Sequence, residues 1–95
     1  MRLANEIAVV TGGGQGIGEA IARRFAAEGA KLAIAEINKE TGDSVAASIN
    51  ESGGTAISIP TDVSDSKAVD SMVDQTLDQL GKPTVLINNA GIAVF

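Results

Sequence analysis

The sequence contains no cysteine, histidine, tyrosine or tryptophan, and these absences restrict the chemistry that the chain can perform. Without cysteine the chain has no thiol nucleophile, which suits a reducing compartment such as the cytoplasm. Without histidine it lacks the commonest metal ligand and the side chain that most often acts as a general base. We therefore expect no metal site and no catalysis based on histidine or cysteine.

Runs of basic residues and long apolar segments are also absent. The chain carries 7 basic and 12 acidic residues, a net charge of −5, and its lysines and arginines are scattered. We therefore expect neither nucleic-acid binding nor a basic membrane-binding face. Residues 1–6 form no apolar signal segment and no stretch approaches transmembrane length, so we expect a cytoplasmic location.

Apolar runs alternate with helical patterns along the whole chain, which is typical of an α/β protein. The first run, residues 7–10, shows no polar alternation, as expected for a strand that is buried on both faces of a parallel sheet. Aromatic residues make up only 2% of the sequence, so the core must consist of Ala, Val, Ile and Leu. The predicted strands are residues 7–10, 31–35, 55–59 and 84–87.

Three helices are predicted between these strands. The first presents an apolar face and ends at Gly29, and the second spans about residues 39–52. The third begins after Ser64 as its N-cap, with Asp65 in its first turn. The predicted inward faces are Ile17, Ile21, Ala22, Phe25 and Ala26 in the first helix, and Val69, Met72, Val73, Thr76, Leu77 and Leu80 in the third.

The pattern β-α-β-α-β-α-β, joined by right-handed crossovers, predicts a parallel sheet with helices on both faces. The usual strand order for such a chain is 3-2-1-4, which is the first half of a doubly wound, Rossmann-like sheet. No linker or shift in composition interrupts the pattern. We therefore expect residues 1–95 to form a single, partial dinucleotide-binding domain.

A glycine-rich segment, TGGGQGIG from Thr11 to Gly18, lies between the first strand and the first helix. Gly12 permits a tight turn, Gly16 lets a phosphate approach the backbone, and Gly18 lets the helix pack close to the sheet. The start of the helix offers free N–H groups and a positive dipole end to an anion. A glycine-rich turn without a ligand is the alternative. The segment is not a P-loop, because no Gly-Lys-Ser/Thr follows.

Glu36 follows the second strand, 18 residues beyond Gly18. A dinucleotide fold places a carboxylate there to accept hydrogen bonds from the adenosine ribose hydroxyls. The same carboxylate would repel a 2′-phosphate, and neither Gln15 nor Ile37 is a basic residue that could compensate. The prediction is therefore NAD in preference to NADP, although the nearby Lys39 weakens the exclusion. An exposed Glu at the start of the next helix is the alternative.

Two further segments follow the third and fourth strands. Asp62 could accept a hydrogen bond from an adenine amino group and Val63 could cover the ring, while a turn or cap is the alternative for Asp62. Residues 88–91, Asn-Asn-Ala-Gly, end the strand that lies beside the first. That point is the topological switch point, where ligands of such sheets bind. An ordinary turn is again the alternative.

Together these motifs resemble the short-chain dehydrogenase/reductase family. Its Thr-Gly-x-x-x-Gly-x-Gly fingerprint, its acid after the second strand, its Asp-Val pair and its Asn-Asn-Ala-Gly segment all occur here in order. The resemblance implies structural roles for Thr11 and Asn88, pyrophosphate binding by the glycine loop, and contacts to the nicotinamide ribose from Asn89 onward. The implied cofactor-binding residues are Gly12, Gly14, Gln15, Gly16, Ile17, Gly18, Glu36, Asp62, Val63, Asn89, Ala90 and Gly91.

The family's catalytic residues have no counterpart in the sequence. Its members transfer hydride with a later Ser, Tyr and Lys, and this chain has no Tyr and ends at Phe95. The resemblance therefore implies the NAD-binding portion of an alcohol or ketone oxidoreductase that is catalytically incomplete as given, with its substrate left open. A freestanding nucleotide-binding or structural module is the alternative. A methyltransferase-like fold is a third, against which residues 88–91 and Thr11 argue.

The outer edge of the last predicted strand has no partner strand in this pattern. Its backbone groups beside Val85 and Ile87 would stay unpaired, and such edges invite pairing with another chain. We therefore expect self-association through this strand, as a symmetric dimer or by exchange of a C-terminal segment.

Overall fold

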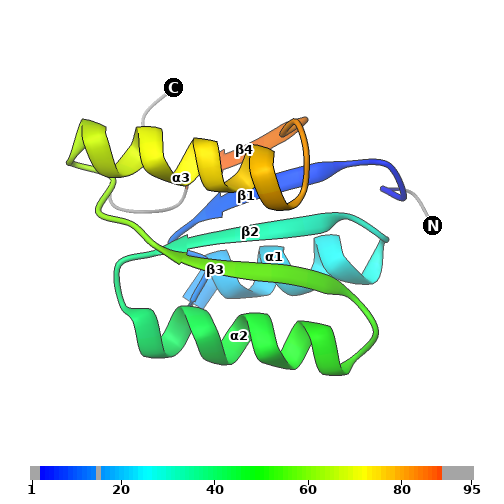
Figure 1. Cartoon of the computed structure of the whole chain (residues 1–95). Helices are drawn as coiled ribbons and strands as arrows, with labels where there is room; N and C mark the ends of the chain where they lie inside the picture. Colours follow the sequence, from blue (N-terminus) through cyan, green and yellow to red (C-terminus); the bar gives the residue numbers. More distant parts are fainter. Residues whose placement is uncertain (1–2, 15, 89–95) are drawn as a thin grey trace.

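The computed structural model describes residues 3–14 and 16–88. Strands and helices alternate along the chain, which confirms the predicted order of elements (Figure 1). The strands are β1 (Ile7–Thr11), β2 (Lys31–Glu36), β3 (Thr55–Pro60) and β4 (Val85–Asn88). The helices are α1 (Gly16–Ala27), α2 (Lys39–Glu51) and α3 (Ser66–Gln79).

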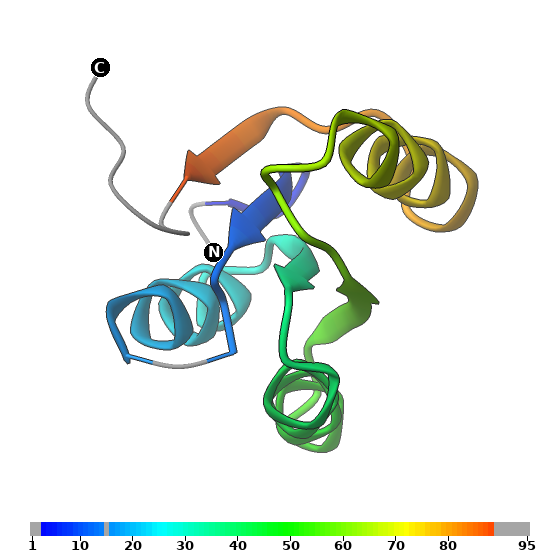
Figure 2. The ribbon, with the colours of Figure 1, turned by 90° about the vertical axis from the view of Figure 1, so that its left-hand side faces the viewer.

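The four strands form one parallel sheet in the order β3-β2-β1-β4, as predicted. Val9 at the centre of β1 pairs with Ala33 of β2 on one side and with Leu86 of β4 on the other. Seen along the sheet, α1 and α2 lie on one face and α3 lies on the other (Figure 2). This arrangement follows from right-handed crossovers, because the chain moves outward from β1 to β3 and then returns past β1 to β4.

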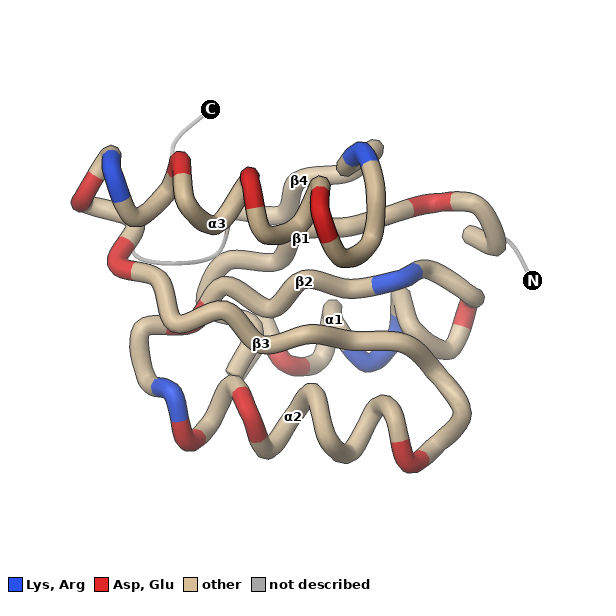
Figure 3. Tube along the Cα trace, in the orientation of Figure 1, with Lys and Arg blue, Asp and Glu red and all other residues tan. Residues whose placement is uncertain are grey.

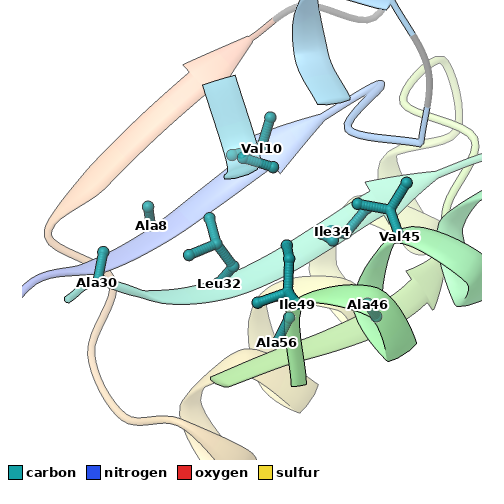
Figure 4. Close-up of a cluster of buried hydrophobic side chains, with 10 residues drawn as sticks. Ala8, Val10, Ala30, Leu32, Ile34, Val45, Ala46, Ile49 and Ala56 are labelled. Carbon is teal, nitrogen blue, oxygen red and sulfur yellow. The ribbon is translucent and has the colours of Figure 1, made fainter. Parts of the chain in front are cut away.

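Successive side chains of each strand point to opposite faces of the sheet. Val10, Leu32 and Ile34 point toward α1 and α2, where they pack with Val45 and Ile49 of α2 (Figure 4). On the other face, a smaller cluster consists of Met72 of α3 and the strand residues Val9, Ala33, Ala35 and Ile59. Apart from Met72, the buried hydrophobic side chains are Ala, Val, Ile and Leu, as the composition predicts.

The predicted start of the third helix was wrong by one residue. Asp65, not Ser64, is the N-cap of α3, and its carboxylate accepts a hydrogen bond from the backbone N–H of Lys67 at 3.0 Å. The hydroxyl of Ser64 instead donates to Asp62 at 2.6 Å, so it is not available for capping. A carboxylate one residue later performs the same function, because Asp caps a helix as well as Ser does.

The predicted inward faces of two helices were partly wrong. Met72 and Thr76 of α3 are buried, but Val73 is 37% exposed and Leu77 48% exposed. Each exposed residue follows a buried one and is therefore rotated by about 100° around the helix, away from the sheet. Ile17 in the first turn of α1 is 71% exposed, because the buried residues of this helix are Gly18 and Ala22 and Ile17 is rotated by about 100° from Gly18.

Candidate functional site

The candidate site lies at the edge of the sheet where the parallel strands end. The segments that leave these strands meet there, because parallel strands have their carboxyl ends at the same edge. Gly12 to Gly14 leave β1, Glu36 ends β2, and Asp62 and Val63 follow β3. The predicted contacts at Gln15, Asn89, Ala90 and Gly91 lie outside the described residues.

The glycine loop turns from β1 toward β2 before α1 begins. Gly12 has φ of 66°, the left-handed conformation that a tight turn requires, and its N–H donates to the carbonyl of Ala35 in β2 at 2.8 Å. Gly16, the first residue of α1, has φ of 59°, and a Cβ atom built on it would meet no heavy atom within 4 Å. A ligand could therefore approach the backbone of Gly16 without displacing protein atoms.

Gly14 is buried and packs tightly against the end of β2 and the start of α2. Its N–H donates to Oε1 of Glu36 at 3.2 Å. A Cβ atom on Gly14 would lie 2.7 Å from Cγ of Glu36 and 2.7 Å from Oγ1 of Thr41. The geometry gives Gly14 a packing role in addition to the cofactor contact that the resemblance implies. Gly18 is buried in α1, in agreement with close packing of that helix on the sheet.

Glu36 is a buried carboxylate, only 4% exposed, so the alternative of an exposed glutamate does not hold. Oε1 accepts the N–H of Gly14, and Oε2 accepts the N–H of Asn38 at 2.9 Å. These two bonds connect the glycine loop to the segment that begins α2 and offset the cost of burying a charge. An ionised carboxylate has about four acceptor positions, so it can accept further hydrogen bonds from a ligand.

Asp62 holds the turn between β3 and α3. Its Oδ1 accepts hydrogen bonds from the hydroxyl of Ser64 at 2.6 Å and from the N–H of Ser64 at 3.0 Å. The hydroxyl, and to a smaller extent the N–H, lowers the pKa of Asp62 below its ordinary value of 3.8. The carboxylate is therefore ionised at neutral pH, and the residue is exposed. Its two bonds with Ser64 show that the turn that the sequence left as an alternative is present.

Three apolar side chains are exposed at this edge of the sheet. Ile17 lies in the first turn of α1, Ile37 follows β2 and is 68% exposed, and Val63 follows β3 and is 38% exposed. Single exposed apolar residues are common, but here each stands at the carboxyl end of a different strand. No contact was predicted for Ile37. The sequence feature that could have indicated one is an apolar residue directly after the acid that ends a strand.

The hydroxyl of Thr11 connects the ends of β1 and β4. It lies 3.0 Å from Oδ1 of Asn88 and 3.3 Å from the carbonyl oxygen of Ile87. These contacts agree with the structural roles that the resemblance implies for Thr11 and Asn88. They join the two strands at the switch point, where the order of the sheet reverses.

The groups at this edge are of the kind that binds anions and sugars in other proteins, rather than of the kind that transfers protons. It combines a helix start, a bent glycine backbone and acceptor carboxylates. Within residues 3–14 and 16–88, no group of His, Cys, Asp and Glu could hold a metal ion. No helix in the same ranges is long and apolar enough to cross a membrane.

A doubly wound sheet with a glycine loop at the first helix and a carboxylate at the end of the second strand defines a nucleotide-binding α/β domain. The sequence profile of the short chain dehydrogenases matches residues 6–95. The chain therefore belongs to the short chain dehydrogenase family, and the resemblance noted in the sequence is confirmed. Members of this family bind nicotinamide cofactors. The methyltransferase alternative is thereby excluded.

Similar proteins agree with this assignment. The meso-2,3-butanediol dehydrogenase of Serratia marcescens is 48% identical over 94 residues, covering 99% of this chain and 37% of the relative. A dehydrogenase/reductase of Sinorhizobium meliloti superposes with a TM-score of 0.90 at 42% identity, covering 95% of this chain and 36% of the other. A 7α-hydroxysteroid dehydrogenase in complex with NADH and 7-oxo glycochenodeoxycholic acid superposes with a TM-score of 0.93 at 35% identity, covering 96% of this chain and 36% of the other. The chain thus spans a little over one-third of the length of these relatives.

Proposed function

We propose that this chain is the NAD-binding portion of an oxidoreductase that transfers hydride between a nicotinamide cofactor and an alcohol or ketone. The observation that carries the proposal is the junction of the glycine loop with Glu36 at the carboxyl edge of the sheet, where Gly14 donates to the carboxylate. This junction places a backbone that can bind phosphates beside a carboxylate that can bind a sugar. The family to which the chain belongs binds nicotinamide cofactors.

The pyrophosphate of the cofactor would bind at the start of α1. The open space beside Gly16 leaves its backbone accessible, and the first turn of the helix presents N–H groups that have no partner within the helix. The chain as a whole is negatively charged, so the positive end of the helix dipole supplies local attraction for the phosphates.

The adenosine ribose would bind beside Glu36, which favours NAD over NADP. The carboxylate is buried, hydrogen-bonded at both oxygens and still able to accept from the ribose hydroxyls. A 2′-phosphate would bring a second negative group to a site of low polarity, where repulsion is poorly screened. Ile37, the next residue, provides no positive charge and instead presents an apolar surface.

The adenine ring would bind against the exposed apolar side chains at this edge. Ile37 and Val63 supply apolar surface from the segments after β2 and β3, and the exposed carboxylate of Asp62 can accept from the adenine amino group. When bound, NAD supplies the hydride-accepting nicotinamide ring. The residues of this chain hold and orient the adenosine half and the pyrophosphate, and none of those described is placed to move a proton.

The test is calorimetric titration of the 95-residue chain with NAD and NADP. We expect weak binding of NAD and weaker binding of NADP, because the contacts come from one half of the cofactor. Gly16→Val should abolish binding, since its side chain fills the space that the phosphates need. Gly53→Val is the matched control: Gly53 also has positive φ and open space, but it precedes β3 at the opposite edge of the sheet.

Three results decide between the functions. Loss of NAD binding in Gly16→Val together with retention in Gly53→Val supports the proposal. An equal loss of NAD binding in both variants would mean that backbone strain causes the effect and that the glycine loop is not part of the site. A folded wild-type chain that binds neither nucleotide contradicts the proposal and favours a freestanding structural module.

A further inference from the structure

The beginning of α2 contains a cation, Lys39, that should favour the binding of NADP. It lies three residues after Glu36, the acid that should oppose this binding. Lys39 is the first residue of α2 and directly follows Asn38, whose N–H donates to Oε2 of Glu36. The lysine side chain is 72% exposed, so its ammonium group can move. A basic residue near the end of the second strand is the group that accommodates a 2′-phosphate in this kind of fold. The start of α2 adds the positive end of a helix dipole.

Asp43, one helical turn further on, holds this ammonium group. Nζ of Lys39 lies 2.5 Å from Oδ2 of Asp43, an ion pair between positions i and i+4 of α2. The pair raises the pKa of Lys39 above its ordinary value, and the lysine in turn lowers the pKa of Asp43.

The backbone that carries Asp43 is held in place by its neighbour Gly42. A Cβ atom on Gly42 would lie 2.8 Å from Oγ of Ser58 and 3.2 Å from Cβ of Glu36, so α2 is in close contact with β2 and β3 at this point. The backbone of Asp43 therefore directly follows a residue that is packed closely against Glu36. The start of α2 carries charges of both signs in close sequence (Figure 3).

We propose that Asp43 is a second determinant of the preference for NAD over NADP, acting through Lys39. It holds the ammonium group toward the second turn of α2 and away from the ribose edge, and so removes the cation that would attract a 2′-phosphate. Asp43 is a positioning residue in this role, because it touches no part of the nucleotide. The inference rests on the proposed function, since it requires a nucleotide at Glu36.

The experiment measures the affinities for NAD and NADP in matched variants. Asp43→Asn should raise the affinity for NADP about three-fold and leave that for NAD unchanged, which is the effect expected for release of one exposed ion pair. Asp43→Glu, which keeps the charge, should retain the wild-type ratio. The gain should vanish in the double variant Lys39→Gln/Asp43→Asn and should shrink at high salt.

Glu40→Gln is the control for charge alone. Glu40 is an acid in the first turn of α2, and no ion pair of Glu40 is present within the described parts of the chain. If Glu40→Gln raises the NADP affinity as much as Asp43→Asn does, net charge is responsible and the role of Asp43 is refuted. The same gain in the Lys39→Gln background, or equal changes for NAD and NADP, also refutes it. A wild-type chain that binds neither nucleotide refutes the proposed function itself, whereas failure of Asp43→Asn alone leaves that function intact.

Discussion

The two faces of the sheet use the same strands but are covered to different degrees. On one face, α1 and α2 close over Leu32 and Ile34, which are completely buried. On the other, α3 covers the sheet alone and leaves an apolar groove of about 510 Å³ beside β4. Leu86 of β4 lies in this groove and is 64% exposed. The groove is lined by Val9, Thr11, Val63, Val69, Met72, Val73, Lys82, Pro83, Leu86 and Asn88.

The difference shows that an apolar strand pattern does not by itself bury a side chain. Val85, Leu86 and Ile87 are consecutive apolar residues of β4, and alternation sends Leu86 to one face and its neighbours to the other. Val85 and Ile87 pack against the larger core cluster, while Leu86 faces the groove. The number of helices on each face of the sheet decides which of these three side chains are covered.

The largest expected effect separates the two faces directly. Leu32→Ala on the covered face should reduce the free energy of unfolding by about 3 kcal/mol, because it leaves a cavity in a packed core. Leu86→Ala in the groove should cost less than about 1 kcal/mol, since its side chain is already largely in solvent. Urea unfolding of the two variants measures both. Equal losses would show that the groove is closed in solution.

A second comparison concerns two glycines of the loop, of which Gly14 is buried and Gly16 is exposed. Gly14→Ala should destabilise the chain by about 2 kcal/mol, because its Cβ would overlap Glu36 and Thr41. Gly16→Ala has open space around it and should cost about 1 kcal/mol, from its left-handed backbone alone. Thermal unfolding with a circular dichroism readout checks this order. A smaller loss for Gly14→Ala would mean that the loop moves away from Glu36 at little cost.

The third prediction concerns the open face as a contact surface. We propose that the chain self-associates through the outer edge of β4, which pairs with no strand among residues 3–14 and 16–88, as strand edges beside apolar surface tend to do. Leu86→Lys should then weaken dimerisation by about ten-fold, which sedimentation velocity measures. Leu77→Lys is the matched control, since Leu77 is an exposed leucine of α3 that does not line the groove. A wild-type chain that stays monomeric at high micromolar concentration contradicts the proposal.

The smallest expected effect is a pH dependence at the loop that precedes α3. The pKa of Asp62 is lowered in the folded chain, so its stabilising contribution is present above its ordinary pKa of 3.8 and is lost as pH falls through the lowered value. Asp62→Asn should therefore lower the urea midpoint slightly at about pH 6, and the difference from wild type should shrink toward about pH 3. A difference that does not vary with pH would mean that the Ser64 contacts do not require the charge.

Most of the fold and part of the candidate site could be predicted from local patterns. The four apolar runs, the glycine loop and the acid after β2 each depend on residues close together in sequence. The N-cap of α3 could not be predicted to the residue, because Ser64 and Asp65 are both good caps and the choice depends on Asp62, which engages Ser64. The packing role of Gly14 could not be predicted either, since it depends on Thr41 of a different element.

The sequence by itself determined the order of elements, the parallel sheet and the position of the glycine loop, because period and turn chemistry are local properties of the chain. Only the tertiary structure decided which apolar residues are exposed, such as Ile37 and Leu86, and how Glu36 is held. Those outcomes depend on which segments lie against each other, and parallel strands bring together segments that are more than twenty residues apart, as for Gly14 and Glu36.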